Sequence, residues 1–370
     1  MSSSAEQNAD PRYLTFMGRG PERIAHWEHW SCPDAESYLT GIDYYEHPRQ
    51  CRQRLRDLYP QLNLDVPADD APRPLPKLDG ETCSSNPVNH TVRWGDGESG
   101  TWQHGEAFFK SVEEVLAFSP LQKANFTDWP HVVVNWDFSS EEGLYEMHRR
   151  NYPAEWGDKA PEGSSAMAGT YNSMFMWPLL TFGWEHFLEA CLRPEFERLM
   201  DEFAELNRRL FRAFARLPVN FIICHDDIVT SRGPVCSPAW MHRYIFPRYE
   251  EFWSIVRAAG KEVLFMADGC MNAYAADVMA CGARGIISEP FTDYKAVARR
   301  FDNPFLAGEG DNRILMRNDP DEIKAMVLCM VETARMSGGY MMCIGNHIPW
   351  NVPPEAIKRY LDLSAQLAVR

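Results

Sequence analysis

Side chains that can ionise or bind a metal lie at or just after the ends of five short apolar runs in the C-terminal part of the chain. The runs cover residues 221–228, 261–269, 285–290, 304–311 and 340–346. Side chains of these types, gathered at one end of a sheet, are suited to acid–base chemistry or to metal binding. They are His225, Asp226, Asp227, Asp268, Cys270, Glu289, Glu309, Asp311, Asn346 and His347.

Carboxylates dominate this set, and carboxylates a few ångströms apart raise one another's pKa. A divalent metal or a cationic group of a substrate would relieve that repulsion. Carboxylate, thiolate and imidazole together can hold a divalent metal, and the presence of Cys and His in the set favours zinc. The residue types therefore predict either a proton-transfer site or a metal site.

Each of these residues also has a structural interpretation. Asp226 or Asp227 can cap the turn after its strand, and Asp268 can form a turn pair with the following glycine. Cys270 can be a small buried side chain in the first turn of a helix, and His347 can be a satisfied structural histidine. The prediction of a site therefore depends on the whole set and not on any one member.

The five apolar runs alternate with segments of helical length, which predicts parallel βα units. The expected helices cover residues 237–259, 272–282, 293–301, 319–337 and 353–369. Their starts carry capping residues, such as Ser before Pro at the first of them and Asp before Pro at the fourth. A doubly wound sheet also fits this pattern, but no glycine-rich phosphate loop follows any run. We therefore predict an α/β fold, a (β/α)8 TIM barrel with an N-terminal elaboration, whose site lies at the carboxyl ends of the strands.

The N-terminal 220 residues are less regular. Residues 61–90 are rich in Pro and Asp and are expected to form a long surface excursion, and residues 131–138 are expected to form a strand. Residues 181–217 carry apolar residues at helical spacing, as two helices that meet near Pro194. We expect residues 1–13 to be a disordered or extended tail and residues 14–370 to form a single domain.

Composition limits the class of protein. The chain has 370 residues and a formal net charge of −15, which argues against nucleic acid and against a basic membrane-binding patch. Its ten cysteines include no CxxC pair, and no apolar run is long enough for a transmembrane helix. These features predict a soluble, cytoplasmic protein with reduced thiols, and composition alone does not distinguish an enzyme from a binding protein.

Four stretches resemble the uroporphyrinogen decarboxylase superfamily. They are GRGPERIA at 18–25, the segment from SPAWMHRYIF to LFMADG at 237–269, GDNRILMRNDPDEI at 310–323 and GGYMMCIGNHIPWNVPPEAI at 338–357. The resemblance implies a (β/α)8 barrel. It also implies one of two activities, namely decarboxylation of porphyrinogens or zinc-dependent methyl transfer between a corrinoid and a thiol or folate.

The resemblance is closer to the methyltransferase-like branch. The arginine-rich segment of the decarboxylases is replaced here by PERIAHWEHW, with Arg23 but no arginine cluster. The methyltransferases place a His-x-Cys metal-binding pair where this chain has Met266 and Asp268. The resemblance therefore implies a substitute metal set, for which the residues at hand are Asp268, Cys270, Glu289 and His347.

The expected function is methyl transfer or O-demethylation with zinc and with a corrinoid, either free or on a partner protein. Asp227, Asp268 and His347 are the expected catalytic residues, and a homodimer is expected from the resemblance. One alternative is a metal-independent decarboxylase or lyase that acts on a small or tetrapyrrole-like carboxylate. Another is a ligand-binding barrel without activity. The residues expected to bind substrate are His225, Asp226, Glu309 and Trp27.

Overall fold

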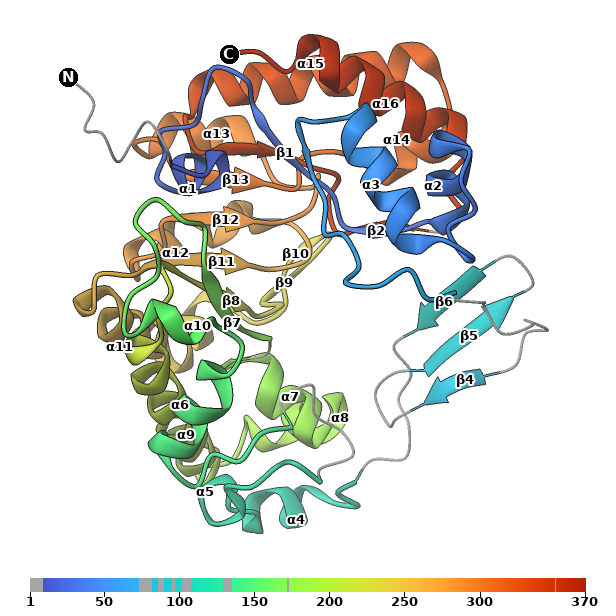
Figure 1. Ribbon diagram of the computed structural model, residues 1–370. Coiled ribbons are helices and arrows are strands. Elements are labelled where there is room, and N and C mark those ends of the chain that lie inside the picture. Colours follow the sequence, from blue (N-terminus) through green and yellow to red (C-terminus); the bar gives the residue numbers. More distant parts are fainter. Residues whose placement is uncertain are drawn as a thin grey trace.

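The computed structural model describes residues 9–72, 82–85, 90–94, 97–101, 108–128, 135–171, 173–349 and 351–370 (Figure 1). Eight strands form one sheet in the order β3-β1-β14-β13-β12-β11-β8-β7, and every neighbouring pair in it is parallel. The strands are β1 (Ala25–Trp27), β3 (Leu62–Asn63), β7 (Met167–Tyr171), β8 (Phe221–His225), β11 (Glu262–Met266), β12 (Gly285–Ile287), β13 (Phe305–Ala307) and β14 (Tyr340–Met342).

The sheet curls so that its last strand returns to its first. Strand β14 pairs with β1, and each other strand lies beside its neighbour in chain order. Within the described residues no ladder joins β3 to β7, and the chain between these two strands forms most of the N-terminal elaboration. The predicted α/β fold of the TIM-barrel type is therefore confirmed.

The helices cover the outside of the sheet, as Figure 1 shows. The predicted helix over 237–259 is interrupted at Ile245, because a new helix begins at Phe246 with Pro247 in its first turn. The predicted break near Pro194 is confirmed, since one helix ends at Ala190 and the next starts at Phe196. The helices that follow the strands are α2 (Pro33–Thr40), α3 (Pro48–Leu58), α7 (Met176–Phe182), α8 (Trp184–Ala190), α9 (Phe196–Arg216), α10 (Pro238–Tyr244), α11 (Phe246–Ala258), α12 (Ala275–Ala280), α13 (Tyr294–Arg300), α14 (Asn312–Arg317), α15 (Pro320–Met336) and α16 (Pro354–Leu367).

The elaboration contains a second, antiparallel sheet and further helices. Strands β4 (Thr82–Ser85), β5 (His90–Trp94) and β6 (Gly97–Thr101) form the sheet. Helices α4 (Val112–Ala117), α5 (Pro120–Lys123) and α6 (Glu141–Arg149) follow it.

The expectation for residues 61–90 was wrong at 62–63, where β3 belongs to the barrel. Of the strand expected over 131–138, residues 131–134 lie outside the described residues, and residues 135–138 form only an isolated bridge at Asp137 and no strand. No helix in the described part of the chain is both long and apolar enough to cross a membrane.

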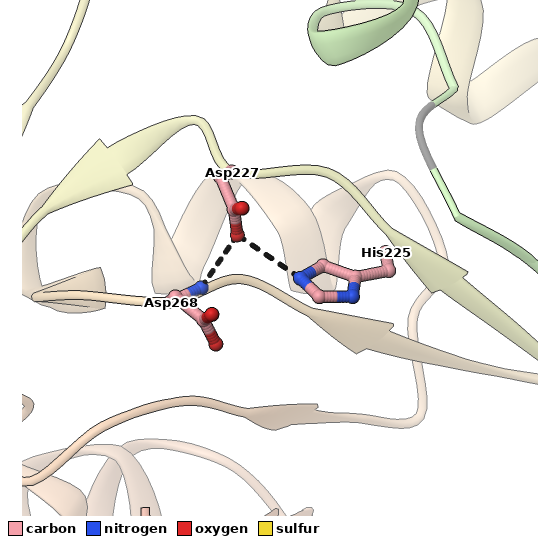
Figure 2. Close-up of side chains that lie close together, drawn as sticks. All are labelled: His225, Asp227 and Asp268. Atoms are coloured by element: carbon pink, nitrogen blue, oxygen red, sulfur yellow. Dashed lines mark hydrogen bonds and ion pairs between the residues drawn. The ribbon is translucent and has the colours of Figure 1, made fainter. Parts of the chain in front are cut away.

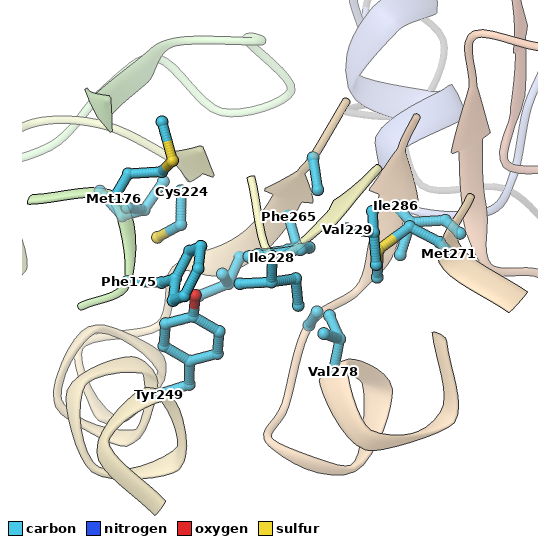
Figure 3. Close-up of a cluster of buried hydrophobic side chains, with 14 of the residues drawn as sticks. Phe175, Met176, Cys224, Ile228, Val229, Tyr249, Phe265, Met271, Val278 and Ile286 are labelled. Atoms are coloured by element: carbon cyan, nitrogen blue, oxygen red, sulfur yellow. The ribbon is translucent and has the colours of Figure 1, made fainter. Parts of the chain in front are cut away.

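Apolar side chains fill both faces of the barrel wall. The outer cluster packs the strands against the helices, and Figure 3 shows part of it, including Tyr249 of α11, Val278 of α12 and Phe265 of β11. The inner cluster combines inward-facing strand residues with Phe16 of helix α1 (Pro11–Phe16). Helix α1 includes the last three residues of the range expected to be a tail, and the domain division at residue 14 stays a prediction.

Helix α1 is predicted to stabilise the barrel through Phe16. The Phe16 ring makes edge contacts with Phe221 and Phe305, each with 4.9 Å between ring centroids. Because such contacts add about 0.5–1.5 kcal/mol per pair, Phe16→Leu should lower the free energy of unfolding by about 1–2 kcal/mol. Urea denaturation measures this change. Leu192→Ala is the control, since Leu192 is 84% exposed. Equal effects of the two substitutions would contradict the role of α1.

Candidate active site and metal centre

Three side chains meet at the carboxyl ends of the neighbouring strands β8 and β11 (Figure 2). One carboxylate oxygen of Asp227, Oδ1, accepts a hydrogen bond from Nε2 of His225 at 3.0 Å. The same oxygen accepts the backbone N–H of Asp268 at 2.8 Å. His225 is buried, and the two aspartates are half-buried. The three residues form a compact group of one imidazole and two carboxylates that faces the inside of the barrel mouth.

The strand pattern explains why these residues meet. Phe221 and Ile223 of β8 belong to the inner cluster, and Cys224 belongs to the outer one. Alternation along the strand therefore directs His225 inward. The register pairs His225 with Met266 of β11 on one side and with Tyr171 of β7 on the other. The rings of Tyr171 and His225 lie edge to face, with 4.1 Å between their centroids.

The group fits a divalent metal ion. One ligand atom from each of His225, Asp227 and Asp268 can be chosen so that all three lie within 4.8 Å of one another. An imidazole nitrogen with two carboxylate oxygens is a set that zinc accepts, as do other divalent ions that prefer nitrogen and oxygen. Three protein ligands also leave a position for a substrate or a water molecule.

The acidic groups near this centre repel one another. Burial, followed by the charge of Asp227, raises the pKa of Asp268 to about 6. Burial, then the charges of Asp268 and Asp227, raise the pKa of Glu289 to about 7. For His225, burial acts to lower the pKa, but the hydrogen bond and charge of Asp227 outweigh it and the net shift is upward. The centre therefore favours a bound proton or a bound cation.

Asp268→Asn is predicted to stabilise the metal-free protein. A carboxyl group whose pKa rises from 3.8 to about 6 on folding destabilises the folded state. This penalty is absent below the unfolded pKa, grows as the pH rises, and is complete above the folded pKa. The variant should therefore melt a few degrees above wild type at pH 8, with a difference that shrinks from pH 6 to pH 4. Thermal denaturation with a chelator present tests this, and a difference independent of pH would contradict it.

A hydrogen-bonded link joins the centre to the loop after β14. The side-chain amide of Asn346 donates from Nδ2 to Oδ2 of Asp268 at 3.0 Å. Its oxygen, Oδ1, lies 2.6 Å from Nδ1 of His347. Burial, then the charge of His29, lowers the pKa of His347 and so favours its neutral form. The predicted catalytic residues Asp227, Asp268 and His347 thus belong to one connected set.

Two residues expected to bind substrate lie away from this set. The carboxylate of Asp226 is fully buried and accepts hydrogen bonds from Ser173 Oγ, Tyr249 Oη and the backbone N–H groups of Phe175 and Met176. These four donors surround the start of α7. The structure therefore gives Asp226 a structural role in place of the expected contact with substrate.

Glu309 is also turned away from the centre. Its carboxylate accepts hydrogen bonds from Thr333 of α15 at 2.9 Å and from Tyr340 at 2.8 Å. Gly308 has a φ of +101°, which breaks the strand alternation just before Glu309. The expected contact of Glu309 with substrate is thus replaced by a contact between the sheet and α15.

The predicted metal set is only partly brought together. The structure groups Asp268 with His225 and Asp227, and within the described residues Cys270, Glu289 and His347 are not part of that group. The backbone N–H of Cys270 instead bonds to the carbonyl of Thr230 at 2.9 Å.

Three further residues near the barrel mouth, Trp27, Tyr171 and Asn346, were predicted to different degrees from the sequence. Trp27 is half-buried against the inner cluster, and its ring stacks near that of His29 at 6.1 Å. Tyr171 was missed because β7 contains little apolar patterning to mark it as a strand. Asn346 was among the residues predicted at the carboxyl ends of the strands, but it had no assigned role, because an amide side chain alone does not indicate a particular chemistry.

The chain is similar to known proteins in sequence and in fold. The family model described as "Uroporphyrinogen decarboxylase (URO-D)" matches residues 184–367. No curated protein sequence matches the chain. Among solved structures, a methyltransferase from Methanosarcina mazei is similar over 96% of this chain and 97% of its own, with 14% identity and a TM-score of 0.54. A xylose isomerase-like TIM barrel protein from Mycobacterium smegmatis, solved in complex with magnesium, covers 70% of this chain and 100% of its own, with 11% identity and a TM-score of 0.28.

Proposed function

The chain belongs to the uroporphyrinogen decarboxylase superfamily, and we propose on this basis that it is a metal-assisted methyltransferase or O-demethylase component. The observation that carries the proposal is the group of His225, Asp227 and Asp268 at the carboxyl ends of β8 and β11. This is the end of a barrel where catalytic groups gather. A methyltransferase with a similar fold over nearly the whole chain supports the same activity.

In this proposal His225, Asp227 and Asp268 would hold a zinc-type ion. When bound, such an ion supplies a Lewis acid that polarises an oxygen or sulfur atom of the substrate. Asp227 orients His225 through their hydrogen bond, and its contact with the backbone of Asp268 fixes the spacing of β8 and β11. Burial favours the neutral form of His347, which would accept or return a proton near the centre, to which Asn346 links it.

The proposed acceptor or donor of the methyl group is a corrinoid, either free or carried by a partner protein. The substrate would be a small molecule with a methyl group on oxygen, sulfur or nitrogen. A homodimer stays a prediction from the resemblance. Trp27, half-buried at the inner edge of β1, would contact the apolar part of the substrate.

A second candidate is a metal-independent decarboxylase or lyase. It is favoured by the raised pKa values of Asp268, about 6, and Glu289, about 7. Carboxyl groups with such pKa values can hold a proton near neutral pH without a metal, and can donate it to a carbanion-like intermediate.

A methyl-transfer assay tests the leading proposal and separates it from the second. Zinc-loaded protein is incubated with cob(I)alamin and a panel of O-, S- and N-methyl compounds, and formation of methylcobalamin is followed by absorbance. We expect conversion with at least one compound, and its loss in His225→Ala and Asp227→Asn. The matched control is His242→Ala, because His242 forms an exposed pair with Asp277 at 3.2 Å. Release of carbon dioxide from small or tetrapyrrole-like carboxylates by the chelated protein, without methylcobalamin formation in the first assay, would favour the second candidate.

A further inference from the structure

Asn346 lies between two parts of the proposed site that come from different strands. Asp268 follows β11, and His347 follows β14, and these strands are separated in the sheet by β12 and β13. The amide of Asn346 hydrogen-bonds to both of them, at 3.0 Å and 2.6 Å. Among the side-chain hydrogen bonds of the described residues, these two form the connection between the metal centre and His347.

The backbone at Asn346 is in a conformation that few residues adopt. Its φ is +64°, in the left-handed region that Asn tolerates better than other residues with a side chain. The loop around it is anchored on both sides. The N–H of Ile344 donates to the buried carboxylate of Glu28 at 3.1 Å, and Asn312 donates to the carbonyl of His347 at 2.5 Å. The loop therefore presents the Asn346 side chain from a fixed position.

The structure shows which way the amide points. Its NH2 group, Nδ2, faces Oδ2 of Asp268, where the carboxylate oxygen accepts the hydrogen bond. The amide oxygen then faces Nδ1 of His347, and since this oxygen is an acceptor, Nδ1 must carry the proton. A neutral imidazole with its proton on Nδ1 has its lone pair on Nε2.

We propose that Asn346 is a positioning residue that orients the Asp268 carboxylate and holds His347 as the tautomer protonated on Nδ1. In this role it leaves Nε2 of His347 as the proton acceptor of the site, and it leaves Oδ1 of Asp268 to the metal. This inference rests on the proposed function for its use in catalysis, but the tautomer itself is a property of the protein without substrate.

The tautomer is measured by NMR of the imidazole nitrogens. Protein labelled with 15N-histidine is studied at pH 8 without metal, and the His347 signals are assigned with His347→Gln. We expect the proton of His347 on Nδ1 in wild type. Asn346→Gly removes the amide but keeps a residue that accepts the positive φ, so the proton should move towards Nε2. The control is Asn318→Gly, because Asn318 also has a positive φ, +52°, at the end of α14.

A zinc titration of the same variants tests the contact with Asp268. Loss of a partner that orients a metal ligand commonly costs 10–100-fold in affinity, so Asn346→Gly should bind Zn²⁺ at least about ten-fold more weakly than wild type. Asn318→Gly should bind it like wild type. A proton on Nε2 in wild type, or a tautomer unchanged in Asn346→Gly, would overturn the inference. Neither of these two results depends on the methyl-transfer assay, so failure of this inference and failure of the proposed function can be told apart.

Discussion

Asp268→Ala is expected to weaken zinc binding by more than about 100-fold and to abolish methyl transfer. Asp268 is one of three ligands in the group, and even the loss of a residue that only orients a ligand costs 10–100-fold in affinity. Removing the ligand itself should cost more. Competition with a chromophoric chelator measures the affinity, and the assay with cob(I)alamin measures the activity.

Two further variants make the Asp268→Ala result interpretable. Asp268→Asn keeps the shape of the side chain and should fold at least as well as wild type, so weak binding by it cannot be explained by misfolding. Asp277→Ala removes the carboxylate of an exposed His–Asp pair and should leave zinc binding unchanged. Wild-type affinity in Asp268→Asn would show that the metal binds elsewhere.

Asp226→Ala is expected to lower the free energy of unfolding by about 4 kcal/mol. The fully buried carboxylate accepts four hydrogen bonds, and its removal leaves those donors without partners in a cavity. Equilibrium denaturation in urea gives the value. If Asp226 instead contacted substrate, the stability would change little and the KM would rise.

A surface aspartate provides the comparison for Asp226. Asp128 forms an exposed pair with Lys123 at 2.9 Å, and Asp128→Ala should leave the stability essentially unchanged. The contribution of the Tyr249 hydroxyl, which donates to the Asp226 carboxylate, can be separated with Tyr249→Phe, which removes this one donor and keeps the ring packing. That variant should lose a smaller part of the stability, about 1 kcal/mol.

The C-terminal strands were predictable because their apolar runs alternate regularly with segments of helical length, and the run at Phe221–His225 is also rich in branched residues. The strands β1 and β3 were not, because no such alternation marks them and only their ladders define them. Strand β7, with the sequence MAGTY, has a glycine at its centre and little apolar character. Its position depends on pairing with β8, which a local pattern does not contain.

The residues that lie at the carboxyl ends of the strands could be predicted from the sequence, but the directions in which their side chains point could be predicted only in part. Alternation along β8 and beyond it places His225 and Asp227 on one side and Asp226 on the other, which the sequence could have indicated. For Glu309 the same rule fails, because Gly308 at φ +101° changes the direction of the chain. The link through Asn346 depends on the folded loop after β14 and leaves no pattern in the sequence.

X-ray absorption of the zinc-loaded protein tests the central claim most directly. We expect one bound zinc per chain with a shell of nitrogen and oxygen atoms at about 2.0–2.2 Å, from His225, Asp227 and Asp268. The shell should be lost in the double variant Asp227→Asn, Asp268→Asn. A sulfur neighbour at about 2.3 Å would place a cysteine such as Cys270 among the ligands and contradict the assignment. Failure to bind zinc at all would contradict the metal-assisted mechanism.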